Sequence, residues 1–200
     1  PTRRALIDQV VQTALPETKN PDEVSATVKA FMANDLTSDL IELLERIILQ
    51  GSDFSKNKNL QNLLILTAIK SDPPRVMEYI NRLDNFDGPE IAKIAVSAEY
   101  ELFEEGVVIY NKFAKRAESE EEKTKLDVEA ITVLVNSLHS MDRAKDFAER
   151  VNEAPVWSTL ATAQLGEAMV DEAITSFVKA DDPSSWSDVV AKAEEVDAYD

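Results

Sequence analysis

The sequence has no cysteine, and among its 200 residues it has only four glycines and one histidine. Without a thiol, the chain has no disulfide framework, no thiolate zinc site and no cysteine nucleophile. The absence of cysteine also fits a reducing compartment, so we expect an intracellular protein. The four glycines are too few for a sheet-rich fold with many tight turns, and no two are close enough for a phosphate-binding loop. These scarcities favour an all-α fold.

Residues that carry chemistry are equally scarce. His139 is the only histidine, and we expect it at the C-terminal end of a helix, where an imidazole favours the exposed carbonyl groups. The Asp84 and Asp87 pair and the Asp181 and Asp182 pair lack the spacing of a twelve-residue calcium loop. No HExxH, Walker A or GxSxG motif is present. The sequence therefore predicts no catalytic residue, no metal site and no cofactor, and we expect that the protein is not an enzyme.

Basic residues are also few. The sequence has 21 Lys and Arg residues and 38 Asp and Glu residues, which gives a net charge of −17. Nucleic acids and anionic lipids bind through clustered Lys and Arg, so both are poor partners for this chain. The sequence has no run of about 18 apolar residues, and its first residues lack the apolar core of a signal peptide. We expect neither nucleic-acid binding nor direct membrane insertion.

Prolines mark the starts of the predicted helices. In "NPDE", Asn20 can cap a helix while Pro21 occupies the first helical position, where its missing N–H costs nothing. Asp72 before Pro73, Gly88 before Pro89 and Asp182 before Pro183 follow the same arrangement; we expect a helix start at each.

Between these starts the apolar residues have helical spacing. Leu43 and Leu44 of "DLIELL" fit an acidic-dileucine sorting pattern, but they fall on the apolar face of a predicted helix and should be buried. We expect this helix to end at Gly51. Residues 60–69 are apolar nearly all round, which predicts a helix enclosed by neighbours. We expect about twelve helices joined by short turns, which makes them antiparallel neighbours. Such a chain is either a bundle or a solenoid.

Internal similarity favours the solenoid. "LFEEGVVIYNKF", "SMDRAKDFAERV" and "MVDEAITSFVKA" share an apolar residue at the first or second position and a small residue at the fifth. A small residue at a fixed place lets a partner helix approach closely. The phrase recurs roughly every 30 residues, the length of one helical hairpin. The predicted helix-packing residues at the fifth position are Gly106, Ala144 and Ala173, with looser matches at Leu40 and Val76.

Further predictions concern single segments of the array. Trp157 and Trp186 each fall in the first turn of a predicted helix, and we expect them to wedge one hairpin against the next. Residues 114–125 are polar throughout and are predicted to be an acidic insertion or an extended helix end. The sequence lacks a starting Met and its last predicted helix has no partner helix, so we expect residues 1–200 to be one α-solenoid fragment of a longer array.

Several phrases closely resemble the leg of the clathrin heavy chain, with its helical hairpin repeats. The phrases that carry the resemblance are "VSATVKAFMANDL", "LIELLERIILQ", "NLQNLLILTAIKSD", "RVMEYINRLDNFD", "DRAKDFAERVNE" and "KADDPSSW". The resemblance extends from about Ala14 to Val190, and several phrases match over ten or more residues. Residues 114–125 depart from the family pattern.

The resemblance implies a fragment of the distal leg, near the knee, of a three-legged coat protein, where it would act as a strut. It implies an α-solenoid of stacked antiparallel hairpins, a superhelix similar to ARM, HEAT and TPR arrays. Its implied role is structural, in coated pits and coated vesicles during endocytosis and intracellular protein transport, at the cytoplasmic face of the membrane. Its implied partners are other heavy chains, in the trimer and in the lattice. The light chain binds the family's proximal leg, so we do not expect it to bind this segment.

Two alternatives stay open at the level of sequence. An α-solenoid subunit of a vesicle tethering or sorting complex uses the same hairpins to hold unlike proteins together. An enzyme or ligand-binding bundle needs a closed pocket with convergent polar groups, for which the sequence offers no candidate set. No particular surface residue is identified as a protein contact.

Overall fold

The computed structural model describes residues 3–10 and 19–197. Within these ranges the chain forms twelve α-helices and two short 3-10 helices, with no strand. The predicted all-α class, the predicted helix number and the helical-hairpin solenoid fold are therefore confirmed. The expected start of the resemblance at Ala14 and the last three residues of the expected unpaired C-terminal helix lie outside the described residues.

The chain divides into two compact units, residues 1–91 and residues 92–200. Helix α6 (Gly88–Ala95) begins in the first unit and ends in the second. The other helices of the first unit are α1 (Arg3–Gln9), α2 (Pro21–Ala33), α3 (Thr37–Leu49), α4 (Lys58–Ser71), the 3-10 helix η2 (Pro73–Arg75) and α5 (Val76–Arg82). Those of the second unit are α7 (Phe103–Ala114), α8 (Glu120–Asn136), α9 (Met141–Val151), α10 (Ala154–Gly166), α11 (Val170–Ala180), the 3-10 helix η3 (Pro183–Ser185) and α12 (Trp186–Asp197).

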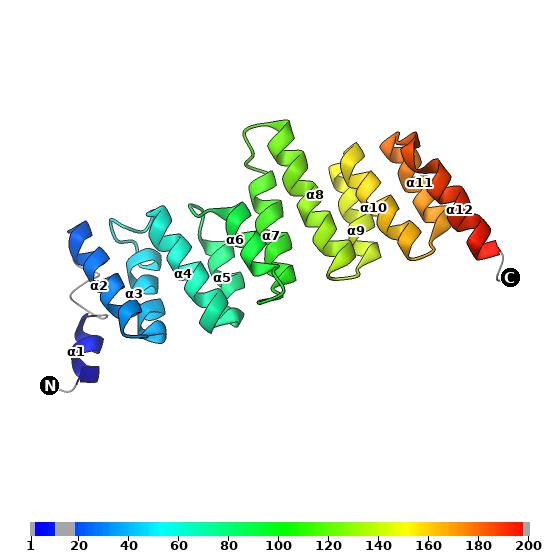
Figure 1. The fold of residues 1–200 in the computed structure, drawn as a ribbon. Helices are drawn as coiled ribbons and strands as arrows, with labels where there is room; N and C mark the ends of the chain where they lie inside the picture. Colours follow the sequence, from blue (N-terminus) through cyan, green and yellow to red (C-terminus); the bar gives the residue numbers. More distant parts are fainter. Residues whose placement is uncertain (1–2, 11–18, 198–200) are drawn as a thin grey trace. The chain divides into compact units, whose positions relative to one another are not determined.

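In the first unit, α3 packs against both α2 and α4, and α4 packs against α5 (Figure 1). Leu43 and Leu44 of α3 are fully buried, as predicted from their place on the apolar face. Leu64 and Ile65 of α4 are also fully buried, which fits the expected enclosed helix. The helix α3 ends at Leu49, and Gly51 follows with a φ of 81°, a conformation that glycine adopts without a steric penalty.

In the second unit, α7 and α8 form a hairpin, and α10 packs against α8, α9 and α11 (Figure 1). The core at the C-terminal end joins three helices through Ala161 of α10, Ala173 and Phe177 of α11, and Val189 of α12. Within each unit, neighbouring hairpins bury apolar side chains against one another, which is the arrangement of a helical repeat.

The proline-marked helix starts are present, although their caps differ. The Asn20 side chain accepts a hydrogen bond from the Asp22 N–H, as predicted, and Asp182 accepts one from the Ser184 N–H. The prediction that Asp72 acts in the same way is wrong. Its carboxylate makes no cap hydrogen bond and instead lies 3.4 Å from Nε of Arg75, which is the last residue of the 3-10 turn that Pro73 begins.

The segment 114–125 is divided between two helices. Ala114 is the buried last residue of α7, residues 115–119 form the connection, and residues 120–125 are the first turns of α8. Ser119 caps α8 by accepting a hydrogen bond from the Glu122 N–H at 3.1 Å, and the acidic residues that follow lie at the positive end of the helix dipole. The description of this segment as an insertion or an extended helix end stays a prediction.

Candidate functional site

The repeated fifth position falls at an equivalent place in four helices, α3, α7, α9 and α11. Leu40, Gly106, Ala144 and Ala173 are buried in α3, α7, α9 and α11, and Val76 is the buried first residue of α5. In α3, α7, α9 and α11, the N–H of the residue at the fifth position of the phrase donates to the carbonyl of the residue that precedes the helix. The candidate site is therefore the set of contacts that join neighbouring hairpins within each unit.

Gly106 makes the closest approach of these positions. A Cβ placed on it would overlap Cγ1 of Val96, which follows α6, and would lie 3.8 Å from the carbonyl oxygen of Ala92. Both neighbours lie in the second unit together with Gly106. The space for a side chain is therefore absent, although the assignment of Gly106, Ala144 and Ala173 as helix-packing residues stays a prediction.

The two tryptophans have different surroundings. Trp157 in α10 is buried, its Nε1 donates to Oδ1 of Asn152 at 3.1 Å, and the Lys179 ammonium lies 4.2 Å from the centre of its ring. Trp186 at the start of α12 is 42% exposed. Trp157 thus contacts the end of α9 and α11, whereas Trp186 has an open face among the described residues; the wedge role of both stays a prediction.

A left-handed residue lies in each of four hairpin turns. These residues are Asp35, Glu101, His139 and Ala168, with φ between 48° and 60°. Each directly precedes the N-cap residue of α3, α7, α9 or α11. The N–H of that N-cap residue donates to a carbonyl group of the helix before the turn. For example, Met169 N–H donates to the Gln164 carbonyl at 2.9 Å. His139 therefore has a place in a turn, and its imidazole makes no hydrogen bond or ion pair with the described part of the chain.

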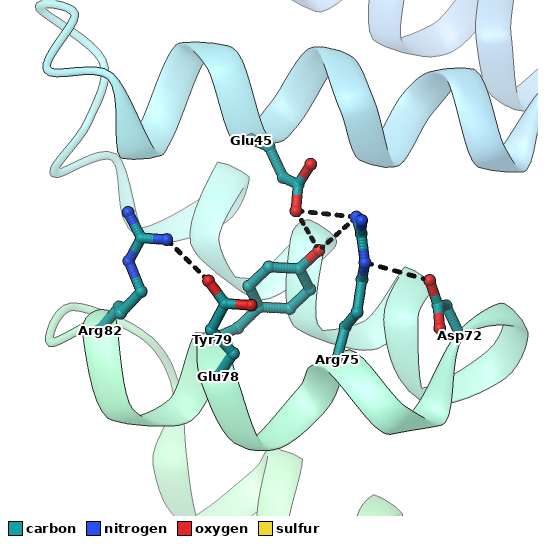
Figure 2. Close-up of polar contacts among 6 residues, drawn as sticks. All are labelled: Glu45, Asp72, Arg75, Glu78, Tyr79 and Arg82. Atoms are coloured by element: carbon teal, nitrogen blue, oxygen red, sulfur yellow. Dashed lines mark hydrogen bonds and ion pairs between the residues drawn. The ribbon is translucent and has the colours of Figure 1, made fainter.

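In the first unit, a polar cluster joins α3 to α5 and η2 (Figure 2). The Tyr79 hydroxyl donates to Oε1 of Glu45 at 2.6 Å, and Nη1 of Arg75 donates to the same oxygen at 2.9 Å. Burial and the hydrogen bond to Glu45 raise the pKa of Tyr79 to about 12. Because the tyrosine side chain is fully buried, its hydroxyl depends on Glu45 for an acceptor.

A second cluster in this unit joins α4 to the turn before α6. Nδ2 of Asn62 donates to Oδ2 of Asp87 at 2.6 Å, the Asp87 N–H donates to Oδ1 of Asn62 at 2.8 Å, and the Lys58 ammonium pairs with the Asp87 carboxylate. Lys58 and Asn62 hold the pKa of Asp87 below its ordinary value. Beside this cluster, Oε1 of Gln61, the residue before Asn62, accepts from the Asn85 N–H at 2.9 Å.

In the second unit, Arg143 of α9 forms a two-pronged ion pair with Glu104 of α7. Nη1 and Nη2 donate to Oε1 and Oε2, each at 2.7 Å. The Arg143 guanidinium lowers the pKa of Glu104. An exposed pair of this kind contributes at most about 1 kcal/mol, but its fork geometry fixes the register of one helix on the next.

The corresponding contact between α8 and α10 is more buried. The Lys123 ammonium pairs with Glu153, which precedes α10, and lies 3.5 Å from Oδ2 of Asp127. Burial raises the pKa of Asp127, whereas hydrogen bonds from Lys123 and Thr124 overcome the effect of burial and lower the pKa of Glu153. The Lys123 ammonium thus lies beside two carboxylates, and its removal would leave both Asp127 and Glu153 without this cation.

The last contacts join α9 to α11 and α10 to η3. Nζ of Lys179 lies 3.8 Å from Oε1 of Glu149, and the Ser158 hydroxyl donates to Oδ2 of Asp182 at 3.0 Å. In both units, therefore, polar pairs bridge helices that belong to successive hairpins, above a core of apolar contacts. These bridges were not predicted from the sequence.

The described ranges contain no group of three or more His, Asp or Glu residues placed to hold a metal ion. None of the helices in residues 3–10 and 19–197 is long and apolar enough to cross a membrane. The hollow beside His139, of about 550 Å³, also has Thr159, Thr162 and Glu167 in its walls, and nothing in the described residues orients the imidazole within it.

Comparison with known proteins identifies the repeat. The sequence model of the Clathrin family, described as a region in clathrin and VPS, matches residues 15–168. The chain is 57% identical over 198 residues to clathrin heavy chain 2 of Oryza sativa subsp. japonica, covering 99% of this chain and 11% of the relative. It is 54% identical over 200 residues to the clathrin heavy chain of Drosophila melanogaster, covering 100% and 11%.

The human relative gives the same result. The chain is 55% identical over 193 residues to clathrin heavy chain 2 of Homo sapiens, covering 96% of this chain and 11% of the relative. The chain thus spans about a ninth of the length of these curated relatives. The resemblance predicted from the sequence phrases is confirmed, and the chain belongs to the Clathrin family of helical repeats.

Proposed function

We propose that this chain is a leg segment of a clathrin coat and acts as a structural strut of the polyhedral lattice. The relatives to which it is 54–57% identical carry the name clathrin heavy chain. A strut needs a regular, stiff arrangement of elements and no reaction centre. The proposed role places the chain in coated pits and coated vesicles, at the cytoplasmic face of the membrane.

The observation that carries this proposal is the repetition of polar bridges between successive hairpins. Glu45 with Arg75, Lys123 with Glu153 and Glu104 with Arg143 each join helices one repeat apart. The apolar core resists separation of the hairpins, whereas a directional polar pair resists their sliding or rotation. A stack held in both ways transmits force along the chain, which is the mechanical demand on a strut.

The partners in this proposal are other heavy chains, within the trimer and across the lattice. A coat must also come apart, so each contact between legs should be weak, with stability arising from many contacts acting together. In the proposed role the light chain binds elsewhere on the heavy chain. The chain binds no nucleic acid and catalyses no reaction.

A tethering or sorting subunit with the same repeats is the alternative role. The family description includes VPS proteins as well as clathrin. The relatives reported above all carry the clathrin name, which favours the coat role.

Competition during coat assembly tests the proposal. Purified clathrin trimers are induced to form cages in the presence of a large molar excess of this chain, and cage yield is measured by sedimentation and electron microscopy. If the chain supplies lattice contacts, it should lower the yield or delay assembly in a dose-dependent way. An unrelated acidic helical-repeat protein of similar size is the control. Equal yield with the chain, the control and buffer alone would contradict the coat role.

A further inference from the structure

Helices α2 and α4 of the first unit leave an apolar groove between them. Two adjoining hollows, of about 360 Å³ and about 520 Å³, share Met32 of α2 and Leu63 of α4 as lining residues. In the second unit, by contrast, α8 and α10 pack closely against each other. We call the two hollows together the α2–α4 groove.

Most of the groove wall is formed by α2 and α4, with further residues from α3 and from the connection before α4. On α4, Leu60, Leu63 and Thr67 line it, and on α2, Val28 and Met32 do so, all at spacings that place them on one side of their helix. Met32 is 57% exposed, among the most exposed large apolar side chains in the described residues. A long apolar side chain held open beside a groove is a feature of adaptable binding surfaces.

The charge of the groove is opposite to that of the chain. Acidic residues outnumber basic ones by 38 to 21 overall, but the charged residues of the groove are Lys29, Lys70 and Asp35. Lys29 lies in one hollow and Lys70 in the other. Neither ammonium group has an ion-pair partner in the parts of the chain that the structure describes, whereas the Asp35 carboxylate accepts a hydrogen bond from the Thr37 hydroxyl at 3.5 Å.

The groove favours a helical occupant over an extended one. Its walls are largely helical, so their backbone N–H and C=O groups are already paired within α2 and α4. An extended segment would lose water from its own backbone groups without finding partners, which costs free energy at each group. A helix satisfies its own backbone and presents apolar residues at i, i+3, i+4 and i+7 to such a groove.

We propose that the α2–α4 groove binds an amphipathic helix of a partner protein that carries leucine-like residues on one face and carboxylates beside them. The apolar face covers Met32 and Leu63, and the carboxylates pair with Lys29 and Lys70. This binding activity is separate from the strut role and does not depend on it.

A direct test uses a designed peptide as the probe. The peptide is fluorescein-labelled, helix-forming and composed of Leu, Ala and Glu, with the leucines on one face and the glutamates flanking them. A second peptide has Lys in place of every Glu. Binding to the 200-residue chain is followed by fluorescence anisotropy at physiological salt, where the net negative charge of the chain is screened beyond about 8 Å and the nearby lysines dominate.

The proposal predicts that the Glu peptide binds more tightly than the Lys peptide. Met32→Glu should weaken binding of the Glu peptide at least tenfold, and the Lys29→Glu, Lys70→Glu double variant should reverse the preference between the peptides. Val178→Glu is the matched control, because Val178 is a 62% exposed apolar residue on α11 in the other unit, and it should leave binding unchanged.

Three outcomes would overturn the proposal. They are no binding of the Glu peptide, equal binding by the wild type and Met32→Glu, and tighter binding of the Lys peptide by the wild type. Sedimentation velocity on the chain alone addresses a different occupant. A dimer that Met32→Glu dissociates would assign the groove to a second copy of this chain and overturn the proposal as well.

Discussion

Gly106→Ala adds one methyl group where the structure leaves no room for it. The new Cβ would overlap Cγ1 of Val96, and valine cannot easily turn aside because its branched side chain has few allowed rotamers. The perturbation therefore falls on the contact between α7 and the residue that follows α6. It tests the close-packing role assigned to the fifth position of the repeat.

Two effects of opposite sign decide the result. Alanine is about 1 kcal/mol more favourable than glycine inside a helix. Forcing an extra methyl group into a packed site costs about 1 to 3 kcal/mol. The steric cost should exceed the gain, so we expect a net loss of about 1 kcal/mol in the free energy of unfolding, or a fall of about 2 to 4 °C in the melting temperature.

Gly166→Ala is the matched control, because a Cβ at this position has no atom within 4 Å and the residue also lies in a helix of the second unit. This variant should melt at or slightly above the wild-type temperature. Both variants are compared by circular dichroism at 222 nm. Adding Val96→Ala should recover much of the loss in Gly106→Ala, so that the two changes together are less harmful than their sum.

The reasoning would be refuted if Gly106→Ala and Gly166→Ala raised the melting temperature equally. It would also be refuted if Val96→Ala and Gly106→Ala were simply additive, since the overlap with Val96 is the stated cause of the loss.

Three further variants test other parts of the account. Tyr79→Phe removes the hydroxyl that bonds Glu45 and should cost about 1 to 2 kcal/mol in urea unfolding at neutral pH. Because the folded-state pKa of Tyr79 is raised from 10.0 to about 12, the wild type should lose stability as pH rises from 10 to 12, and Tyr79→Phe should lose less; equal slopes would contradict the buried hydroxyl. Ala168→Gly should raise the free energy of unfolding by about 0.5 to 1 kcal/mol, because the φ of 60° at this position strains alanine. Ala26→Gly, in the exposed interior of α2, should lower it by about 1 kcal/mol. A change of the same sign in both variants would contradict the strain assigned to the left-handed turn. Ala173→Trp should jam α11 against its neighbours and cost about 1 to 3 kcal/mol or more; a variant that melts like the wild type would show that the site has room.

The fold was predictable because its signals are local and repeated. Apolar spacing, prolines and one glycine marked many helix boundaries, and the fifth-position phrase marked the repeat. The left-handed turns were missed because their residues are Asp35, Glu101, His139 and Ala168, where glycine is the usual signal. The available clue was indirect, since Glu101, His139 and Ala168 each immediately precede one of the repeated phrases.

The bridges between hairpins could not be predicted in the same way. Lys123 and Glu153 are one repeat apart, but many other charged residues of this acidic chain are as well. Only the packing of α8 against α10 places these two side chains together. At Asp72 the local sequence was misleading. It predicts a helix cap, but the carboxylate pairs with the nearby Arg75 guanidinium instead.

Small-angle X-ray scattering on the 200-residue chain tests the strut most directly. A compact bundle of this length should have a radius of gyration of about 16 Å. The account predicts a clearly larger value and an elongated distance distribution, because each hairpin is expected to pack only on its neighbours along the stack. A radius close to the compact value would mean that the hairpins close on one another, and it would contradict the proposed role as a strut.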